Sequence, residues 1–147
     1  MKISFTGHRL GPKIGGYFVP NSVYDKICRQ IKFTLKILKP EKCLSGMAIG
    51  VDQWAAQICV NLKIPFIAAV PFLGQENAWP PDSRIKYRNL LAKAAEIHIV
   101  SEGEYSPEKM QIRNRWMVDN SDLVLAVFDG KKEGGTWNCV KYAKSKN

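Results

Sequence analysis

Short apolar runs alternate with helical patterns along nearly all of the 147 residues, and this alternation limits the fold more than any other feature. The expected strands are 2–5, 42–45, 65–72, 96–101 and 122–129, and the expected helices are about 21–38, 50–62, 82–94, 106–121 and 134–146. Strands that alternate with helices of ten or more residues predict a parallel sheet with helices on both faces. We therefore expect one α/β domain over residues 1–147, with a sheet of about five strands.

Side chains that can cap a helix precede three of the expected helices. Asn21 or Ser22 can cap the first helix, and Ser106 can cap the fourth, with a proline in its first turn. Asp82 or Ser83 is expected to cap the third helix.

Composition excludes several classes of protein. No apolar run reaches the ~20 residues that a membrane span needs, and the first residues show no signal-peptide pattern, so we expect a cytoplasmic protein without membrane association. Four scattered cysteines form neither a C-x-x-C pair nor a cluster with histidine, so no metal site is expected and the thiols should be reduced.

The net charge of +9 is concentrated in the first third of the chain, where residues 1–50 hold nine basic and two acidic side chains. Five of these basic residues share one face of the first expected helix: Lys26, Arg29, Lys32, Lys36 and Lys39. Such a face is either solvated or docks a polyanion such as nucleic acid, and no nucleic-acid motif accompanies it.

Polar and glycine-rich segments follow the expected strands, and parallel strands bring such segments to one edge of the sheet, where ligands bind. Two of the turns open directly into helices, whose N-terminal N–H groups and dipole suit a phosphate. The expected ligand-binding residues are Thr6, Gly7, His8, Arg9, Ser45, Gly46, Met47, Ala48, Gly50, Asp52, Pro71, Arg113, Asp129, Gly134, Gly135 and Thr136. Gln75 and Trp79 could form a lid or stack on a base, or could anchor a loop over the core.

The segment "SGMAIGVD" resembles the glycine-rich signature of the SLOG superfamily, a Rossmann-like group that includes DprA and the Lonely Guy phosphoribohydrolases. The order of "TGHR", "SGMAIGVDQWAA", "RNRWMVDNSDLVLAVFDG" and "GGT" is most similar to the YpsA-like branch. The resemblance covers the chain from Ile3 to about Ala143. It implies a single Rossmann-like domain that binds a nucleotide or a nucleotide derivative.

The resemblance to Lonely Guy enzymes also implies catalytic positions. Those enzymes cleave an N-glycosidic bond with an arginine, which matches Arg113, and with a glutamate three residues after the threonine that matches Thr136. That glutamate position holds Cys139, and a thiol cannot stabilise an oxocarbenium-like state unless it is ionised. Asp52 and Glu133 are the candidates for a displaced carboxylate.

The leading prediction is therefore binding or sensing of a nucleotide or nucleotide-derived phosphosugar of the ADP-ribose type, without a required cofactor. Whether the chain is an enzyme stays open, and the missing glutamate favours a binder that does not catalyse. The first alternative is a nucleotide N-glycosidase of the phosphoribohydrolase type. The second is a DNA-associated protein similar to DprA, with nucleic acid as a partner. A homodimer is also a reasonable expectation, because related folds often dimerise.

Overall fold

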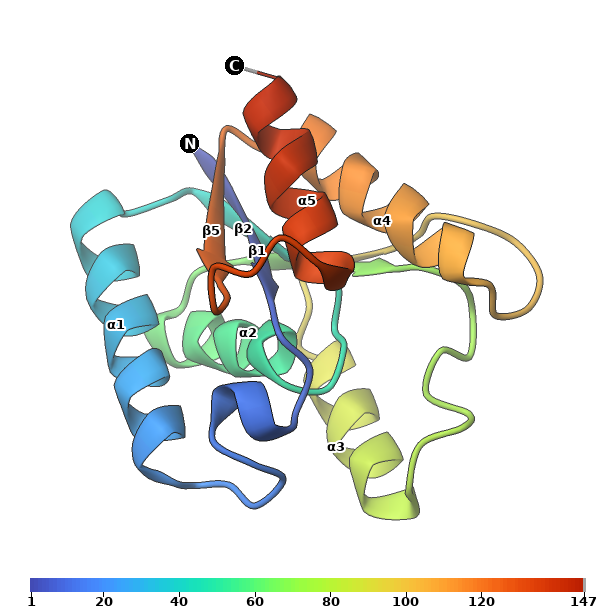
Figure 1. Cartoon of the computed structure of the whole chain (residues 1–147), viewed down its shortest axis with the longest axis horizontal. Coiled ribbons are helices and arrows are strands. Elements are labelled where there is room, and N and C mark those ends of the chain that lie inside the picture. Colours follow the sequence, from blue (N-terminus) through green and yellow to red (C-terminus); the bar gives the residue numbers. More distant parts are fainter. Residues whose placement is uncertain (147) are drawn as a thin grey trace.

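The computed structural model describes residues 1–146 and contains a five-stranded parallel sheet flanked by helices (Figure 1). The strands are β1 (Lys2–Gly7), β2 (Lys42–Ser45), β3 (Phe66–Val70), β4 (Glu96–Ile99) and β5 (Leu123–Val127). The helices are α1 (Ser22–Leu38), α2 (Val51–Leu62), α3 (Pro81–Leu91), α4 (Pro107–Asp119) and α5 (Gly134–Ser145), with a short 3-10 turn η1 at Pro12–Ile14. The predicted fold class is confirmed.

The strand order is β4-β3-β2-β1-β5, and every neighbouring pair is parallel. The chain steps outward from β1 to β4, so right-handed crossovers place α1, α2 and α3 on one face. It then returns past β1 to form β5, so α4 and α5 cover the opposite face (Figure 1). The direction of winding therefore reverses at β1 and β5, and open α/β sheets bind ligands at such a point.

Apolar side chains form a core on each face of the sheet. The larger core lies under α1, α2 and α3 and includes Phe5, Ile31, Leu35, Phe66 and Tyr87. The smaller core, under α4, contains Leu44, Ile67, Ala69 and Met117. All five residues of β3 are buried, as its apolar run predicts. Among the helices of residues 1–146, none is long and apolar enough to cross a membrane.

Helix starts agree with the sequence at two of three sites. The Asn21 side chain accepts a hydrogen bond of 2.9 Å from the Tyr24 N–H, and the Ser106 side chain caps α4 at Lys109. The prediction of Asp82 or Ser83 as a cap is wrong, because α3 begins at Pro81 and both residues lie inside its first turn. Proline suits this first helical position since it has no N–H to leave unpaired.

Candidate functional site

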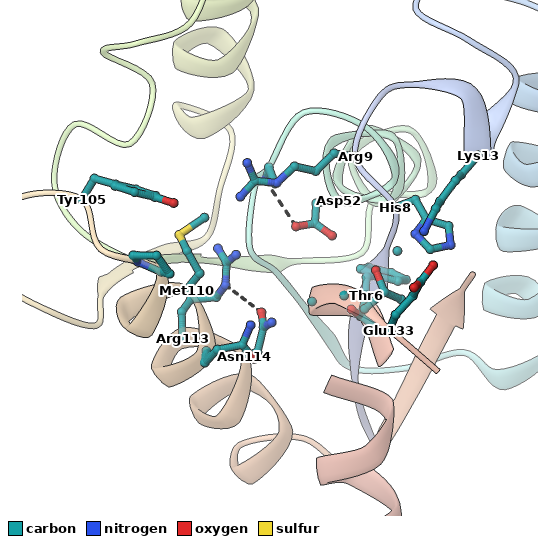
Figure 2. A pocket seen from close by; sticks show the side chains of 18 residues that line it. Thr6, His8, Arg9, Lys13, Asp52, Tyr105, Met110, Arg113, Asn114 and Glu133 are labelled. Atoms are coloured by element: carbon teal, nitrogen blue, oxygen red, sulfur yellow. Dashed lines mark hydrogen bonds between the residues drawn. The ribbon is translucent and has the colours of Figure 1, made fainter. Parts of the chain in front are cut away.

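A cavity of about 400 Å³ opens at the carboxyl edge of the sheet, beside β1 and the start of α5 (Figure 2). Four segments that are distant in sequence meet there: the end of β1, the β2–α2 turn, one face of α4 and the first residues of α5. The lining residues are Phe5, Thr6, Gly7, His8, Arg9, Lys13, Ala48, Asp52, Tyr105, Pro107, Met110, Gln111, Arg113, Asn114, Glu133, Gly134, Gly135 and Thr136. The cavity therefore occupies the position that the strand order favours for a ligand.

Arg113 projects from α4 into this cavity although only 4% of its surface is exposed. Its Nη1 donates to the carbonyl oxygens of Gly46, at 2.6 Å, and Ala69, at 3.2 Å. Its Nε donates to the Asn114 side chain at 3.0 Å (Figure 2). Burial lowers the pKa of this guanidinium, and the Asp52 charge acts in the opposite direction. Since arginine stays protonated even so, Arg113 brings a rigidly held cation to the cavity wall.

Packing against Arg113 requires a glycine at position 46, which the glycine-rich signature alone does not reveal. A Cβ added at this position would lie 2.4 Å from Arg113 Nη1 and 2.5 Å from Cζ. Both distances are shorter than a non-bonded contact allows, so only glycine leaves room for the guanidinium above the backbone. Gly46 therefore supports Arg113 and does not itself line the cavity.

Asp52 is a buried carboxylate at the start of α2 that lines the same cavity. One of its oxygens accepts a hydrogen bond of 3.3 Å from the Ala48 N–H. Burial raises the pKa of this carboxyl group, while Arg113, the Ala48 N–H and Arg9 partly offset that increase. Asp52 can therefore accept a hydrogen bond from a ligand hydroxyl or, when protonated, donate a proton.

The first turn of α5 forms a second wall of the cavity through Gly134, Gly135 and Thr136. Glu133 occupies the N-cap position, but its side chain makes no capping hydrogen bond. The first N–H groups of a helix have no partner within the helix, and the helix dipole adds positive potential there. This helix start is therefore able to bind an anion.

His8 and Asp129 join the end of β1 to the turn after β5. The Asp129 N–H donates a hydrogen bond of 2.9 Å to His8 Nε2. Nε2 can accept this bond only when it carries no proton, so the imidazole ring is neutral. Burial lowers the pKa of His8, and this favours the hydrogen bond over an ion pair, although Nε2 also lies 3.6 Å from the Asp129 carboxylate. The same carboxylate accepts from the Lys131 N–H and lies 3.6 Å from Lys13 Nζ. Asp129 thus fixes His8 from outside the cavity lining.

Ten of the sixteen predicted ligand-binding residues line this cavity: Thr6, Gly7, His8, Arg9, Ala48, Asp52, Arg113, Gly134, Gly135 and Thr136. Six do not: Ser45, Gly46, Met47, Gly50, Pro71 and Asp129. Ser45 ends β2 and Met47 lies in the β2–α2 turn, and both are buried. The Ser45 hydroxyl donates to the Asp52 carbonyl. Gly50 supports the turn with a positive φ of 121° and forms a β-bridge with Arg9.

The candidate catalytic residues Arg113, Asp52 and Glu133 all border the cavity. Cys139 does not, and only 2% of it is exposed. Burial raises the pKa of the Cys139 thiol, while the Thr6 hydroxyl beside it acts in the opposite direction. A neutral, buried thiol cannot replace the glutamate of the Lonely Guy enzymes.

Gln75 and Trp79 line a neighbouring cavity of about 610 Å³. The Trp79 ring packs edge-on against Tyr87 at 5.2 Å and joins the larger core, so it anchors its loop. Gln75 is buried, and its Nε2 donates to the Gly46 carbonyl and to the Tyr87 hydroxyl, each at 3.2 Å. These contacts support the interpretation that Trp79 anchors its loop over the core. Gln75 is held in the wall of the second cavity.

Sequence reasoning missed the contribution of α4 beyond Arg113. Four more residues of α4 line the cavity from one face of the helix: Pro107, Met110, Gln111 and Asn114. Helical spacing from Arg113 could have identified Met110, three residues earlier, and steps of three and four from Met110 lead to Pro107 and Asn114. Lys13 comes from the short 3-10 turn η1 and Tyr105 from the loop before α4, and neither segment is long enough to give a periodic signal. In the described part of the chain, no group of three His, Cys, Asp or Glu side chains is placed to hold a metal ion.

The basic face of α1 is exposed and lies outside both cavities. Phe33 and Ile37 are 67% and 61% exposed among Lys26, Arg29 and Lys36. The face thus combines basic and apolar side chains, including an aromatic ring that the sequence interpretation overlooked.

Comparisons with known proteins agree with this architecture. The family model YpsA, described as the YspA SLOG family, matches residues 5–147. The chain is 37% identical over 137 residues to the SPbeta prophage-derived protein YoqJ of Bacillus subtilis, covering 82% of this chain and 79% of YoqJ. It is 32% identical over 109 residues to a UPF0398 protein of Bacillus thuringiensis, covering 70% of this chain but only 59% of that relative.

A solved structure of DNA processing protein A from Helicobacter pylori, described for its single-stranded DNA binding mode, has the same fold. It has a TM-score of 0.67 and 20% identity, over 99% of this chain and 61% of that chain. The family match and the sequence similarity to YoqJ together show that the chain belongs to the YspA SLOG family.

Proposed function

We propose that the cavity binds a nucleotide or a nucleotide-derived phosphosugar of the ADP-ribose type, with a phosphate at the start of α5. One observation carries the proposal: the uncapped first turn of α5 and the buried Arg113 line the same cavity. Arg9 and Lys13 add positive charge, so three cations and a helix N-terminus stand against the two carboxylates Asp52 and Glu133. This balance favours an anionic ligand.

The two carboxylates suit the rest of such a ligand. Asp52 has oxygen lone pairs beyond the one that accepts from Ala48, and ribose hydroxyls are donors. The phosphate would then lie between Arg113 and the Thr136 N–H group, while the sugar would be placed near Asp52. The family relationship supports a nucleotide-related ligand, although it identifies none.

Calorimetry with inorganic phosphate, ribose 5-phosphate, AMP and ADP-ribose tests this proposal. Thr136→Val removes a hydroxyl from the phosphate position with little change of shape, and the loss of a hydrogen bond to a charged group should weaken binding about tenfold. Thr34→Val is the matched control, because the Thr34 hydroxyl donates to the Gln30 carbonyl on α1, away from the cavity. Absence of binding by all four compounds would refute the proposal.

An N-glycosidase is a second candidate, because Asp52 and Glu133 both line the cavity. Burial raises the pKa of Asp52 toward values at which a carboxylic acid can donate a proton. Incubation with AMP, followed by chromatography, would detect free adenine if the bond were cleaved. Base release that disappears in Asp52→Asn, with retained binding, would favour the enzyme over the binder.

A nucleic-acid function is favoured by the α1 face alone, where an exposed Phe33 stands among basic residues. Basic grooves with exposed aromatic rings are typical of proteins that bind single strands. Binding of an oligonucleotide that weakens with salt and with Phe33→Ala would support it, and absence of binding at low salt would remove it.

A further inference from the structure

The second cavity, beside the phosphate-binding candidate, has a different chemistry. Both cavities are lined by Arg9, Tyr105 and Met110, so they meet at these three side chains. The second cavity is also lined by Phe72, Leu73, Gly74, Gln75, Asn77, Ala78, Trp79, Gly103 and Glu104. Charged groups are therefore concentrated in the first cavity, and aromatic and apolar groups in the second.

Tyr105 stands at the junction and is 64% exposed. In Figure 2 its ring extends from the loop before α4 toward Met110 and Arg113. The ring contacts Phe72 edge-on at 6.1 Å between centroids. Lys109 holds the loop by donating to the Glu104 carbonyl, and the Ser101 N–H donates to the Pro71 carbonyl at 3.1 Å. The Tyr105 ring is thus an exposed flat surface on a loop that is tied to the sheet.

Gln75 supplies a second, independent observation. It is 6% exposed and lines the second cavity, and its Oε1 is the one buried side-chain oxygen or nitrogen in residues 1–146 without a hydrogen-bond partner. The two bonds made by Nε2 fix which end of the amide is the oxygen, because the Gly46 carbonyl can only accept. A buried acceptor without a donor is costly, and a ligand amino group that reached Oε1 from the cavity would satisfy it.

We propose that the second cavity receives the aromatic base of the ligand whose phosphate lies at the start of α5, with the base stacked on Tyr105. The inference rests on the proposed function and narrows it, because it selects a nucleotide over a bare phosphosugar. Bases are flat and apolar on both faces and carry donors at their edges, which matches the aromatic lining and the free acceptor of Gln75. Arg9 borders both cavities, and its planar guanidinium can contact either the phosphate or the base.

Calorimetry can separate the contribution of the base from that of the phosphate. The probes are ribose 5-phosphate and the four ribonucleoside 5′-monophosphates. At least one of the four is expected to bind about tenfold more tightly than ribose 5-phosphate, the size of one base–aromatic stack. Tyr105→Ala should reduce this ratio to about one, whereas Tyr105→Phe should retain it. Tyr17→Ala is the matched control, because Tyr17 is 65% exposed and lines neither cavity.

The outcomes distinguish the two proposals. If ribose 5-phosphate binds as tightly as every monophosphate, or if Tyr105→Ala weakens both kinds of probe equally, the base does not enter the second cavity. If none of the five probes binds, the inference is refuted, and the proposed function is refuted with it when inorganic phosphate and ADP-ribose also fail to bind.

Discussion

Gly46→Ala is the most direct test of how the cavity is built. The added Cβ would lie within 2.5 Å of two guanidinium atoms of Arg113, so the guanidinium must move away from the backbone. That movement breaks the bonds from Nη1 to the carbonyls of Gly46 and Ala69. A hydrogen bond from a charged donor contributes about 1.5–3 kcal/mol. Because the displaced guanidinium can still reach water in the cavity, we expect a net loss of about 3 kcal/mol in the free energy of unfolding.

Urea unfolding, followed by tryptophan fluorescence, measures this loss, and thermal unfolding should show a decrease in Tm of about 10 °C. Calorimetry with inorganic phosphate should show weaker binding, since the guanidinium leaves its position. Gly11→Ala is the matched control, because the nearest atom to an added Cβ there is the Tyr17 hydroxyl oxygen at 3.6 Å. We expect that control to change stability by less than about 0.5 kcal/mol.

A double-mutant cycle shows whether Arg113 is the cause. Once Arg113→Ala has removed the guanidinium, Gly46→Ala should cost far less than in the wild type. An equal cost in both backgrounds, or a Gly46→Ala protein as stable as the wild type, would refute the reasoning.

Three further predictions concern side chains around the cavity. Burial raises the pKa of Asp52, so stability falls as pH rises from the unfolded pKa of about 3.9 through the folded value. Asp52→Asn should therefore have a higher Tm than the wild type at pH 7 and an equal one below about pH 4, and scanning calorimetry at both pH values checks this. Lys13→Ala should weaken phosphate binding about threefold at low salt and less at high salt, because this lysine is partly exposed. Cys139 should react with iodoacetamide at pH 8 far more slowly in the native protein than in urea, which mass spectrometry of the labelled peptide would show.

Periodic patterns account for what the sequence could predict. The run 65–72 is apolar throughout and contains β3, Phe66–Val70, all of whose residues are buried. Asn21 and Ser106 have side chains that can cap a helix, and both do so. The predicted cap at Asp82 or Ser83 is wrong because α3 already begins at Pro81, which puts Asp82 inside the first turn. A shift of one residue changes which backbone position a side chain occupies, and the capping position depends on it.

The cavity was predictable as an edge of the sheet but not residue by residue. A glycine in a sequence shows that space or a positive φ is needed, without showing what fills the space. At Gly46 the space is filled by Arg113, which lies 67 residues further along the chain. The structure therefore predicts that substitutions at these two positions are coupled: relatives without the arginine are free to lose the glycine.

The position of β1 between β2 and β5 has a consequence for synthesis of the protein. Residues 6–9 leave the ribosome more than a hundred residues before Thr136 and its helix. Until β5 has been made, the β1 edge has no partner on that side, and the helix start that we propose to bind a phosphate does not exist. Nascent chains should consequently bind no phosphate compound before residue 136 has emerged. Binding at the proposed site can therefore stabilise the fold only after nearly all of these residues have been synthesised.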